Sequence, residues 1–178
     1  MKLLQLLPIG ELPAGVLLNL APALANTFHV PCEVLSRTLN AAFAFHVERQ
    51  QYHSSEILRR MQDHVRADSW RVLGITMVDL YIPILTFVFG EAQIGGPCAV
   101  ISAHRLQQEF YGLPHDEDLL HDRLRKEAVH ELGHTLELTH CDDYSCAMAP
   151  SHAVEWIDLK ESALCPNCAS RIFQPVER

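Results

Sequence analysis

The residues best suited to chemistry in this chain form the run His130-Glu131-Leu132-Gly133-His134. This is the HExxH pattern, in which two histidines four residues apart lie on the same face of a helix. Their ring nitrogens can reach one Zn²⁺ ion, while Glu131, about 100° around the helix, can accept a proton from a zinc-bound water. The alternative is an exposed helix with ordinary histidines, so the residues that follow the motif decide between the two.

His140 stands six residues beyond His134. Three neutral imidazoles leave a fourth tetrahedral position for water, which is the open arrangement of a catalytic zinc. Taken alone, His140 is typical of a surface residue, and its spacing from His130 and His134 is what makes it the third candidate ligand. Asp142 and Asp143 are expected to be solvated turn residues, although either is an alternative ligand.

Four cysteines follow directly, with Cys141 and Cys146 spaced as C-x4-C and Cys165 and Cys168 as C-x2-C. Four thiolates make a closed, tetrahedral structural zinc site. The alternative is two disulfides, which a reducing cytosol disfavours and which an adjacent C-x2-C pair would strain. We therefore expect two Zn²⁺ ions per chain, one catalytic and one structural.

The HExxH run needs a helix, and its surroundings predict one from about residue 119 to about residue 137. Leucine or alanine recurs every four residues along this segment, which gives it one core-facing side. The acidic run 116–118 suits the positive potential of the first turn. Further helices are expected at 14–26, at 53–67 with Ser54 or Ser55 as its cap, and at 156–163. Buried strands are expected at 2–7, 29–35, 71–79, 85–90 and 98–103.

The chain has 178 residues, enough for one α/β domain with a substantial core. We expect an upper α/β subdomain at 1–140 and a small Cys-rich lobe at 141–178.

The net charge of −8 disfavours nucleic acid as a partner. No apolar stretch reaches the roughly 18–20 residues that span a bilayer, so no membrane association is expected. Residues 1–25 resemble a secretory signal, but prolines and a glycine interrupt them, and a cytoplasmic monomer is expected instead.

The run HELGHTLELTHCDDYSCAM at 130–148, followed by CPNC at 165–168, resembles the archaemetzincins, a family of zinc-dependent metalloproteases. The family pattern is HExxHxxGxxH, followed directly by C-x4-C-x-M and later by C-x2-C. The segment 73–96 also resembles the strand region that walls the substrate cleft in that family.

The resemblance implies a compact metzincin-like fold, with a twisted mixed sheet, an active-site helix and a small zinc-stapled C-terminal lobe. It implies that Glu131 is the general base and that Met148 belongs to the Met-turn, a tight turn forming an apolar floor beneath the zinc histidines. It also implies a catalytic zinc on His130, His134 and His140, and a structural zinc on Cys141, Cys146, Cys165 and Cys168.

One position departs from the family pattern, because the glycine between the second and third histidines is Glu137 here. That glycine normally ends the helix and turns the chain toward the metal. A residue other than glycine in the left-handed conformation costs on the order of 1 kcal/mol or more. Either Glu137 accepts that strain, or the helix continues and His140 is displaced. We favour the strained turn, because Cys141 must follow His140 closely to reach its own zinc.

These observations predict a zinc-dependent metallopeptidase that hydrolyses peptides or small unfolded substrates. A zinc-bound water activated by Glu131 attacks the scissile carbonyl, and Glu131 then gives the proton to the leaving amine. The strand ending near residues 90–94 is expected to hold the substrate backbone at the sheet edge. The alternative is a catalytically weak or inactive, zinc-stabilised peptide-binding module, which Glu137 would favour. A zinc-ribbon nucleic-acid adaptor is disfavoured by the charge of the last residues.

Overall fold

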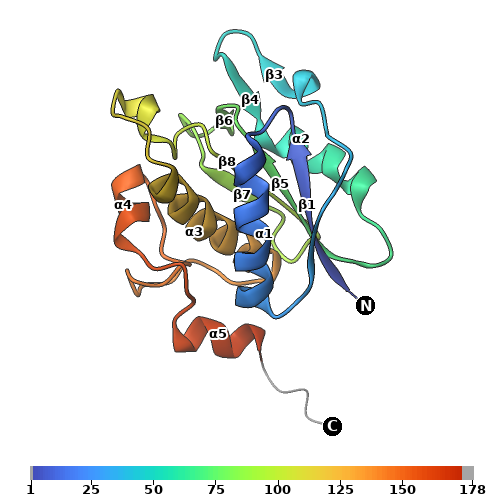
Figure 1. Cartoon of the computed structure of the whole chain (residues 1–178), viewed down its shortest axis with the longest axis vertical. Coiled ribbons are helices and arrows are strands. Elements are labelled where there is room, and N and C mark those ends of the chain that lie inside the picture. The colour runs from blue at the N-terminus through green and yellow to red at the C-terminus, as the bar shows by residue number, and fades with distance from the viewer. Residues whose placement is uncertain (1, 174–178) are drawn as a thin grey trace.

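The computed structural model describes residues 2–173. Its central sheet contains β1 (Leu3–Ile9), β2 (Cys32–Val34), β5 (Ser69–Thr76), β7 (Gly90–Ala92) and β8 (Cys98–Ser102). The strands lie in the order β2-β1-β5-β8-β7 (Figure 1). The first four of these are parallel, whereas β7 runs antiparallel to β8 at one edge. The sheet is therefore mixed, as predicted.

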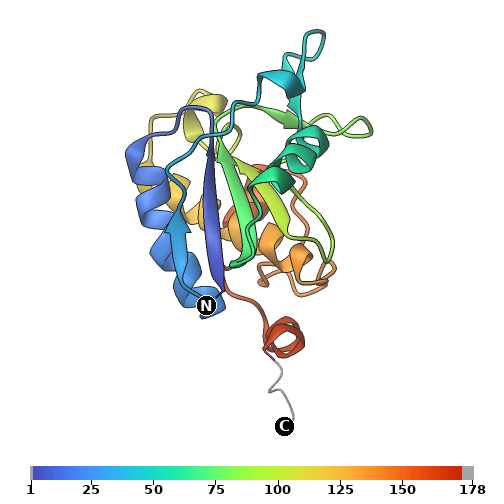
Figure 2. The ribbon, with the colours of Figure 1, turned by 90° about the vertical axis from the view of Figure 1, so that its right-hand side faces the viewer.

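Helices cover both faces of this sheet (Figure 2). The helices α1 (Ala14–Phe28) and α3 (Glu117–Thr135) pack on one face, and α2 (Ser54–Met61) packs on the other. Strands buried on both faces read as continuous apolar runs, which explains the sequence of β1. Its Leu4 and Leu6 belong to the core shared with α1 and α3, while Leu7 and Ile9 belong to the core shared with α2.

A second, three-stranded sheet lies at the upper end of the molecule in Figure 1 and was not predicted. It contains β3 (Phe45–His46), β4 (Gln51–His53) and β6 (Leu80–Tyr81), in that order. Short 3₁₀ helices occur at Ala42–Ala44, Gln62–His64 and Gln108–Tyr111.

The C-terminal part of the described chain is mostly irregular and carries two short helices. The first, α4 (Val154–Leu159), packs beside α3, and the second, α5 (Pro166–Ile172), lies below it in Figure 1. Pro166 occupies the first position of α5, where its missing N–H costs nothing. This helix was not predicted from the sequence.

The predicted helix at 53–67 is too long, since α2 ends at Met61 and a 3₁₀ turn follows. The predicted caps are also wrong. The N-cap is His53, whose Nδ1 accepts a hydrogen bond from the Glu56 N–H. The hydroxyls of Ser54 and Ser55 instead donate to the Glu91 carboxylate on β7. These serines therefore tie α2 to the edge strand.

Four further predictions need correction. Residues 85–89 form a loop with one isolated bridge at Val88, and the strand begins only at Gly90. The helix predicted at 156–163 covers only Val154–Leu159, because the chain becomes extended at Lys160 and carries that side chain into the core. The strand predicted at 71–79 ends at Thr76, and the strand predicted at 29–35 shortens to β2.

The predicted fold class is confirmed, with a mixed sheet, a long helix carrying the HExxH run and a Cys-rich C-terminal segment. Helix α3 begins two residues before its predicted start, because Asp116 caps it by accepting a hydrogen bond from the Leu119 N–H at 2.9 Å. Between residues 2 and 173, no helix combines the length and the apolar character that crossing a bilayer requires.

Candidate active site

The last two turns of α3 carry His130, Glu131 and His134. The Nδ1 atom of His130 lies 2.8 Å from the carbonyl oxygen of Ala147, and that of His134 lies 2.8 Å from the carbonyl oxygen of Leu138. A carbonyl can only accept, so each ring carries its proton on Nδ1 and presents the Nε2 lone pair. The two Nε2 atoms are 3.2 Å apart. Both lone pairs are thus available to one metal ion.

The chain turns sharply where α3 ends. Glu137 has a φ of 65°, which is the left-handed conformation predicted for this position. The N–H of Glu137 donates to the carbonyl of His134 at 3.0 Å, and the N–H of Leu138 donates to that of Gly133 at 3.1 Å. This pair of hydrogen bonds is a Schellman motif, which satisfies carbonyls that the helix end leaves free. The turn directs the chain back over the cavity side of α3.

The turn brings His140 to the other two histidines. One ring nitrogen from each of His130, His134 and His140 lies within 4.8 Å of the others. Burial lowers the pKa of all three imidazoles, most strongly for His130, where the positive charge of Lys160 adds to the effect. Three neutral imidazoles with converging nitrogens fit a zinc ion with an open coordination position.

Glu131 is buried and faces the edge strand. A Cβ on Gly90 would lie 2.7 Å from Glu131 Cγ and 2.9 Å from Oε1, so β7 needs glycine at this point. Burial raises the pKa of the Glu131 carboxyl well above its usual range, and the nearby Glu127 charge raises it further. The arrangement places a buried carboxyl group beside the histidine cluster, in the same cavity.

The segment beneath the histidines is held tightly against α3. A Cβ on Gly133 would lie 2.3 Å from Met148 Sδ, so the fully buried Met148 occupies space that any larger residue at 133 would fill. The carbonyl of Met148 accepts a hydrogen bond from the Cys141 N–H at 3.0 Å. Met148 therefore packs against α3 at Gly133, directly before His134.

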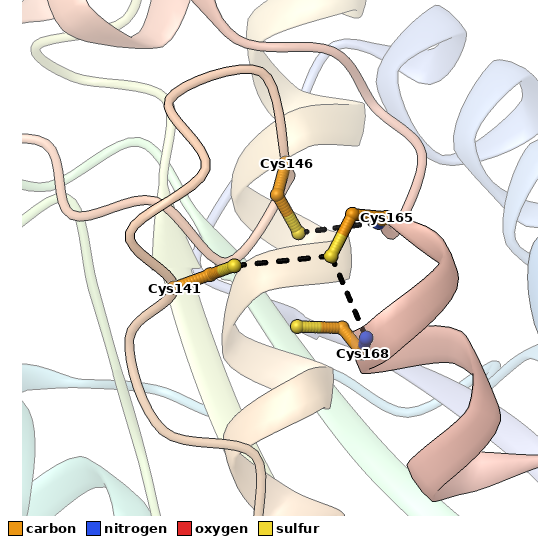
Figure 3. A group of neighbouring side chains, drawn as sticks. All are labelled: Cys141, Cys146, Cys165 and Cys168. Carbon is orange, nitrogen blue, oxygen red and sulfur yellow. Dashed lines mark hydrogen bonds between the residues drawn. The ribbon is translucent and has the colours of Figure 1, made fainter.

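The four cysteines of the C-terminal segment converge on one point (Figure 3). Their sulfur atoms all lie within 4.8 Å of one another, and all four are free thiols. Backbone N–H groups point at two of the sulfurs, from Cys165 to Cys146 Sγ at 3.3 Å and from Cys168 to Cys165 Sγ at 3.5 Å. The Cys168 N–H lowers the pKa of the Cys165 thiol. This donor set fits a closed zinc site.

A cavity of about 470 Å³ opens onto the histidine cluster. It is bounded by His130, His134, His140 and Glu131 on one side and by residues of β7 on another. Its volume lies within the range of about 300–1,000 Å³ that is usual for ligand sites. The sequence-predicted catalytic residues therefore share one cavity, and the cysteines form a separate cluster.

A buried ion pair beside this cavity was not predicted from the sequence. Lys160 Nζ lies 3.2 Å from Glu127 Oε1, with the two side chains only 1% and 4% exposed. The same ammonium donates to the carbonyl of Ala149 at 3.2 Å. The pair thus connects α3 to the residue after Met148. Glu127 precedes Glu131 by one helical turn, which was the available signal, whereas nothing in the sequence marked Lys160.

The sequence profile of peptidase family M54 matches residues 11–174. The archaemetzincin of Methanocaldococcus jannaschii is 38% identical over 165 residues, covering 93% of this chain and 89% of that protein. The archaemetzincin of Thermococcus kodakarensis is 34% identical over 184 residues, covering 99% of this chain and 98% of that protein.

Solved structures agree with the sequence comparisons. A zinc-dependent peptidase from Methanocorpusculum labreanum superposes with a TM-score of 0.85 at 29% identity, covering 95% of this chain and 99% of that chain. The archaemetzincin of Archaeoglobus fulgidus, solved with malonate, superposes with a TM-score of 0.81 at 34% identity, covering 96% and 99%. The predicted resemblance is confirmed. The chain therefore belongs to peptidase family M54 and is a zinc metalloprotease of the archaemetzincin kind.

Proposed function

We propose that His130, His134 and His140 hold the catalytic zinc of this peptidase and that Glu131 moves the protons of peptide hydrolysis. The observation that carries this proposal is the convergence of the three rings, with two of them oriented by Nδ1 hydrogen bonds to backbone carbonyls. When bound there, zinc supplies a Lewis acid that activates water and polarises the substrate carbonyl.

Glu131 accepts a proton from the attacking water and delivers it to the departing amine. Its side chain lies against Gly90 and lines the same cavity as the histidines, so it is within reach of a peptide bound there. It is not a member of the histidine cluster, which supports a role in proton transfer and not in holding metal.

The substrate backbone lies along β7. This strand is at the edge of the central sheet, and all three of its residues line the cavity. An edge strand presents unpaired N–H and carbonyl groups, which can pair with an extended peptide. The substrate is therefore a peptide segment in an extended conformation.

The second proposed metal is a structural zinc on Cys141, Cys146, Cys165 and Cys168, which makes two zinc ions per chain. Because Cys141 directly follows His140, this zinc fixes the start of a small lobe at 141–178 against the α/β subdomain at 1–140. The lobe and the α/β subdomain belong to one domain, since Leu138 packs with Cys146, Met148 and Cys168 in one cluster.

We further propose a cytoplasmic monomer that does not bind nucleic acid. The six thiols suit a reducing compartment, and the net charge of −8 disfavours nucleic acid. An inactive peptide-binding module is not favoured, because Glu137 adopts the turn that joins His140 to the cluster.

The test combines zinc analysis with hydrolysis of an internally quenched peptide library. Protein purified without chelator is expected to carry two zinc ions and to cleave peptides. Mild chelation removes the zinc of the open site first and stops cleavage while the protein stays folded. His140→Ala is expected to lose one zinc ion, whereas His152→Ala, a matched change in the same cavity, keeps both. Equal zinc content in the two variants would remove His140 from the ligand set.

A further inference from the structure

The cavity has an apolar side that the proposed reaction does not use. Residues 82–89 read Ile-Pro-Ile-Leu-Thr-Phe-Val-Phe, in which only Thr86 is polar. Six of these residues line the cavity, and we call the five apolar ones the apolar wall: Ile82, Leu85, Phe87, Val88 and Phe89. An apolar surface kept open at a cavity mouth is a mark of a binding site. The Leu85 side chain is 48% exposed, although burying it would stabilise the fold.

The backbone of the apolar wall is held by side chains from the small upper sheet. Arg49, in the turn between β3 and β4, donates from Nη2 to the carbonyls of Leu85 at 2.6 Å and Thr86 at 3.0 Å. Gln51 on β4 donates to the same Thr86 carbonyl at 3.0 Å. Figure 2 shows the green loop after β6 projecting from the same end of the molecule as the cyan β3–β4 hairpin. The wall is thus ordered before any substrate binds.

The aromatic part of the apolar wall is supported from behind. The Arg105 guanidinium lies 4.2 Å from the centre of the Phe87 ring, and two hydrogen bonds of 2.7 Å fix it to Asp79. The Phe87 and Phe89 rings meet edge to face, with centroids 5.1 Å apart. A surface held in one conformation loses little entropy when a ligand binds, so its apolar contacts count more fully toward affinity.

The charges around the cavity oppose one class of substrate. Glu91, Glu127 and Glu131 line the cavity, and among the described residues that line it there is no lysine or arginine. Lys160 lies behind Glu127 and is 1% exposed. An acidic substrate side chain beside β7 would approach the Glu91 carboxylate and find no lysine or arginine among these lining residues, which disfavours its binding.

We propose that the apolar wall is the specificity subsite of the peptidase and that it takes a large apolar side chain, such as Leu, Met or Phe, next to the scissile bond. The proposal rests on the proposed function, because both use the same cavity. β7 begins at Gly90, directly after Phe89, so a peptide backbone beside β7 lies next to the wall.

The test uses two series of end-blocked, internally quenched peptides. One series varies the residue before the cleaved bond and the other varies the residue after it, and each series contains Leu, Phe, Ala, Ser or Asp at the varied position. Wild-type protein is expected to prefer Leu or Phe to Ser by tenfold or more in kcat/KM, at about the strength of a filled hydrophobic pocket. Leu85→Ser is expected to lower kcat/KM about tenfold for the Leu peptide and to change the Ala peptide little.

Ile84→Ser is the matched control. Ile84 belongs to the same loop and is 86% exposed, but its side chain does not line the cavity. We expect unchanged kcat/KM ratios for this variant. Equal losses in Leu85→Ser and Ile84→Ser, or a wild-type protein indifferent to the scanned side chain, would overturn the subsite.

A binding measurement separates this proposal from the proposed function. Fluorescence anisotropy of the labelled Leu and Ser peptides, measured with zinc-loaded Glu131→Gln, is expected to show tighter binding of the Leu peptide. Equal affinities would overturn the subsite even if wild-type protein cleaves peptides. An apolar preference in binding, together with no cleavage of any peptide by the wild-type protein, would support the subsite and refute the proposed function.

Discussion

Glu137 gives the sharpest test of the local geometry, because two backbone conformations there predict opposite results. Its φ of 65° places Glu137 in the left-handed region, where a residue with a Cβ loses about 1–2 kcal/mol of conformational stability. Glu137→Gly removes that cost, while the greater freedom of glycine in the unfolded chain returns about 0.5–1 kcal/mol of it. We therefore expect the glycine variant to be as stable as wild-type protein or more stable.

Glu137→Ala is the matched variant, because it removes the carboxylate but keeps the Cβ. Both variants lose the contact that the Glu137 side chain makes beside Gly95. The comparison between them therefore isolates the backbone strain. We expect the glycine variant to be more stable than the alanine variant by about 1 kcal/mol, which for a chain of this size is a difference of about 2–4 °C in Tm.

The assay is urea and thermal unfolding of the three zinc-loaded proteins under the same conditions. If the helix instead continued through Glu137, alanine would be the more stable residue by about 1 kcal/mol, because glycine weakens a helix interior. An alanine variant at or above the stability of the glycine variant would therefore refute the turn and the account of how His140 reaches the other histidines.

Three other perturbations test the surroundings of the site. Gly133→Ala places a Cβ 2.3 Å from Met148 Sδ, so urea unfolding should show a loss of about 1–3 kcal/mol, whereas any gain would contradict the packing. Lys160→Met should destabilise by about 3–5 kcal/mol because Glu127 is left buried without its cation, and a neutral result would mean that the pair is hydrated. Burial raises the pKa of Asp79, but hydrogen bonds from its partners outweigh burial and leave the folded pKa below its usual value. Its contribution is therefore full above the unfolded pKa of about 3.9 and lost as the pH falls through the folded pKa, so the difference in stability from Asp79→Asn should shrink in acid.

The residues of the two candidate metal sites could be predicted because their spacing already determines their geometry. His130 and His134 share a helical face by sequence separation alone, and Cys141 ties the position of His140 to a second cluster. The strained turn at Glu137 could be predicted for the same reason, since only a reversal of the chain satisfies both clusters.

The loop conformation of residues 85–89 could not be predicted, because an apolar run of this length is also what a buried strand contains. The contacts that Leu85 and Phe87 make in this loop come from Arg49 and Arg105, which lie outside the segment in the sequence. The prediction that Ser54 or Ser55 caps α2 was wrong for a similar reason. Their acceptor, the Glu91 carboxylate on β7, comes close only in the folded chain.

The most direct test of the central claim is the turnover of a blocked, quenched peptide by wild-type protein and by Glu131→Gln, with zinc content measured on the same samples. We expect equal zinc content and equal melting temperatures, and a loss of kcat of at least about 100-fold in the variant, the usual contribution of a general acid–base group. A variant that turns over peptide at the wild-type rate, or one that has lost zinc, would contradict the assignment of Glu131 as the proton carrier.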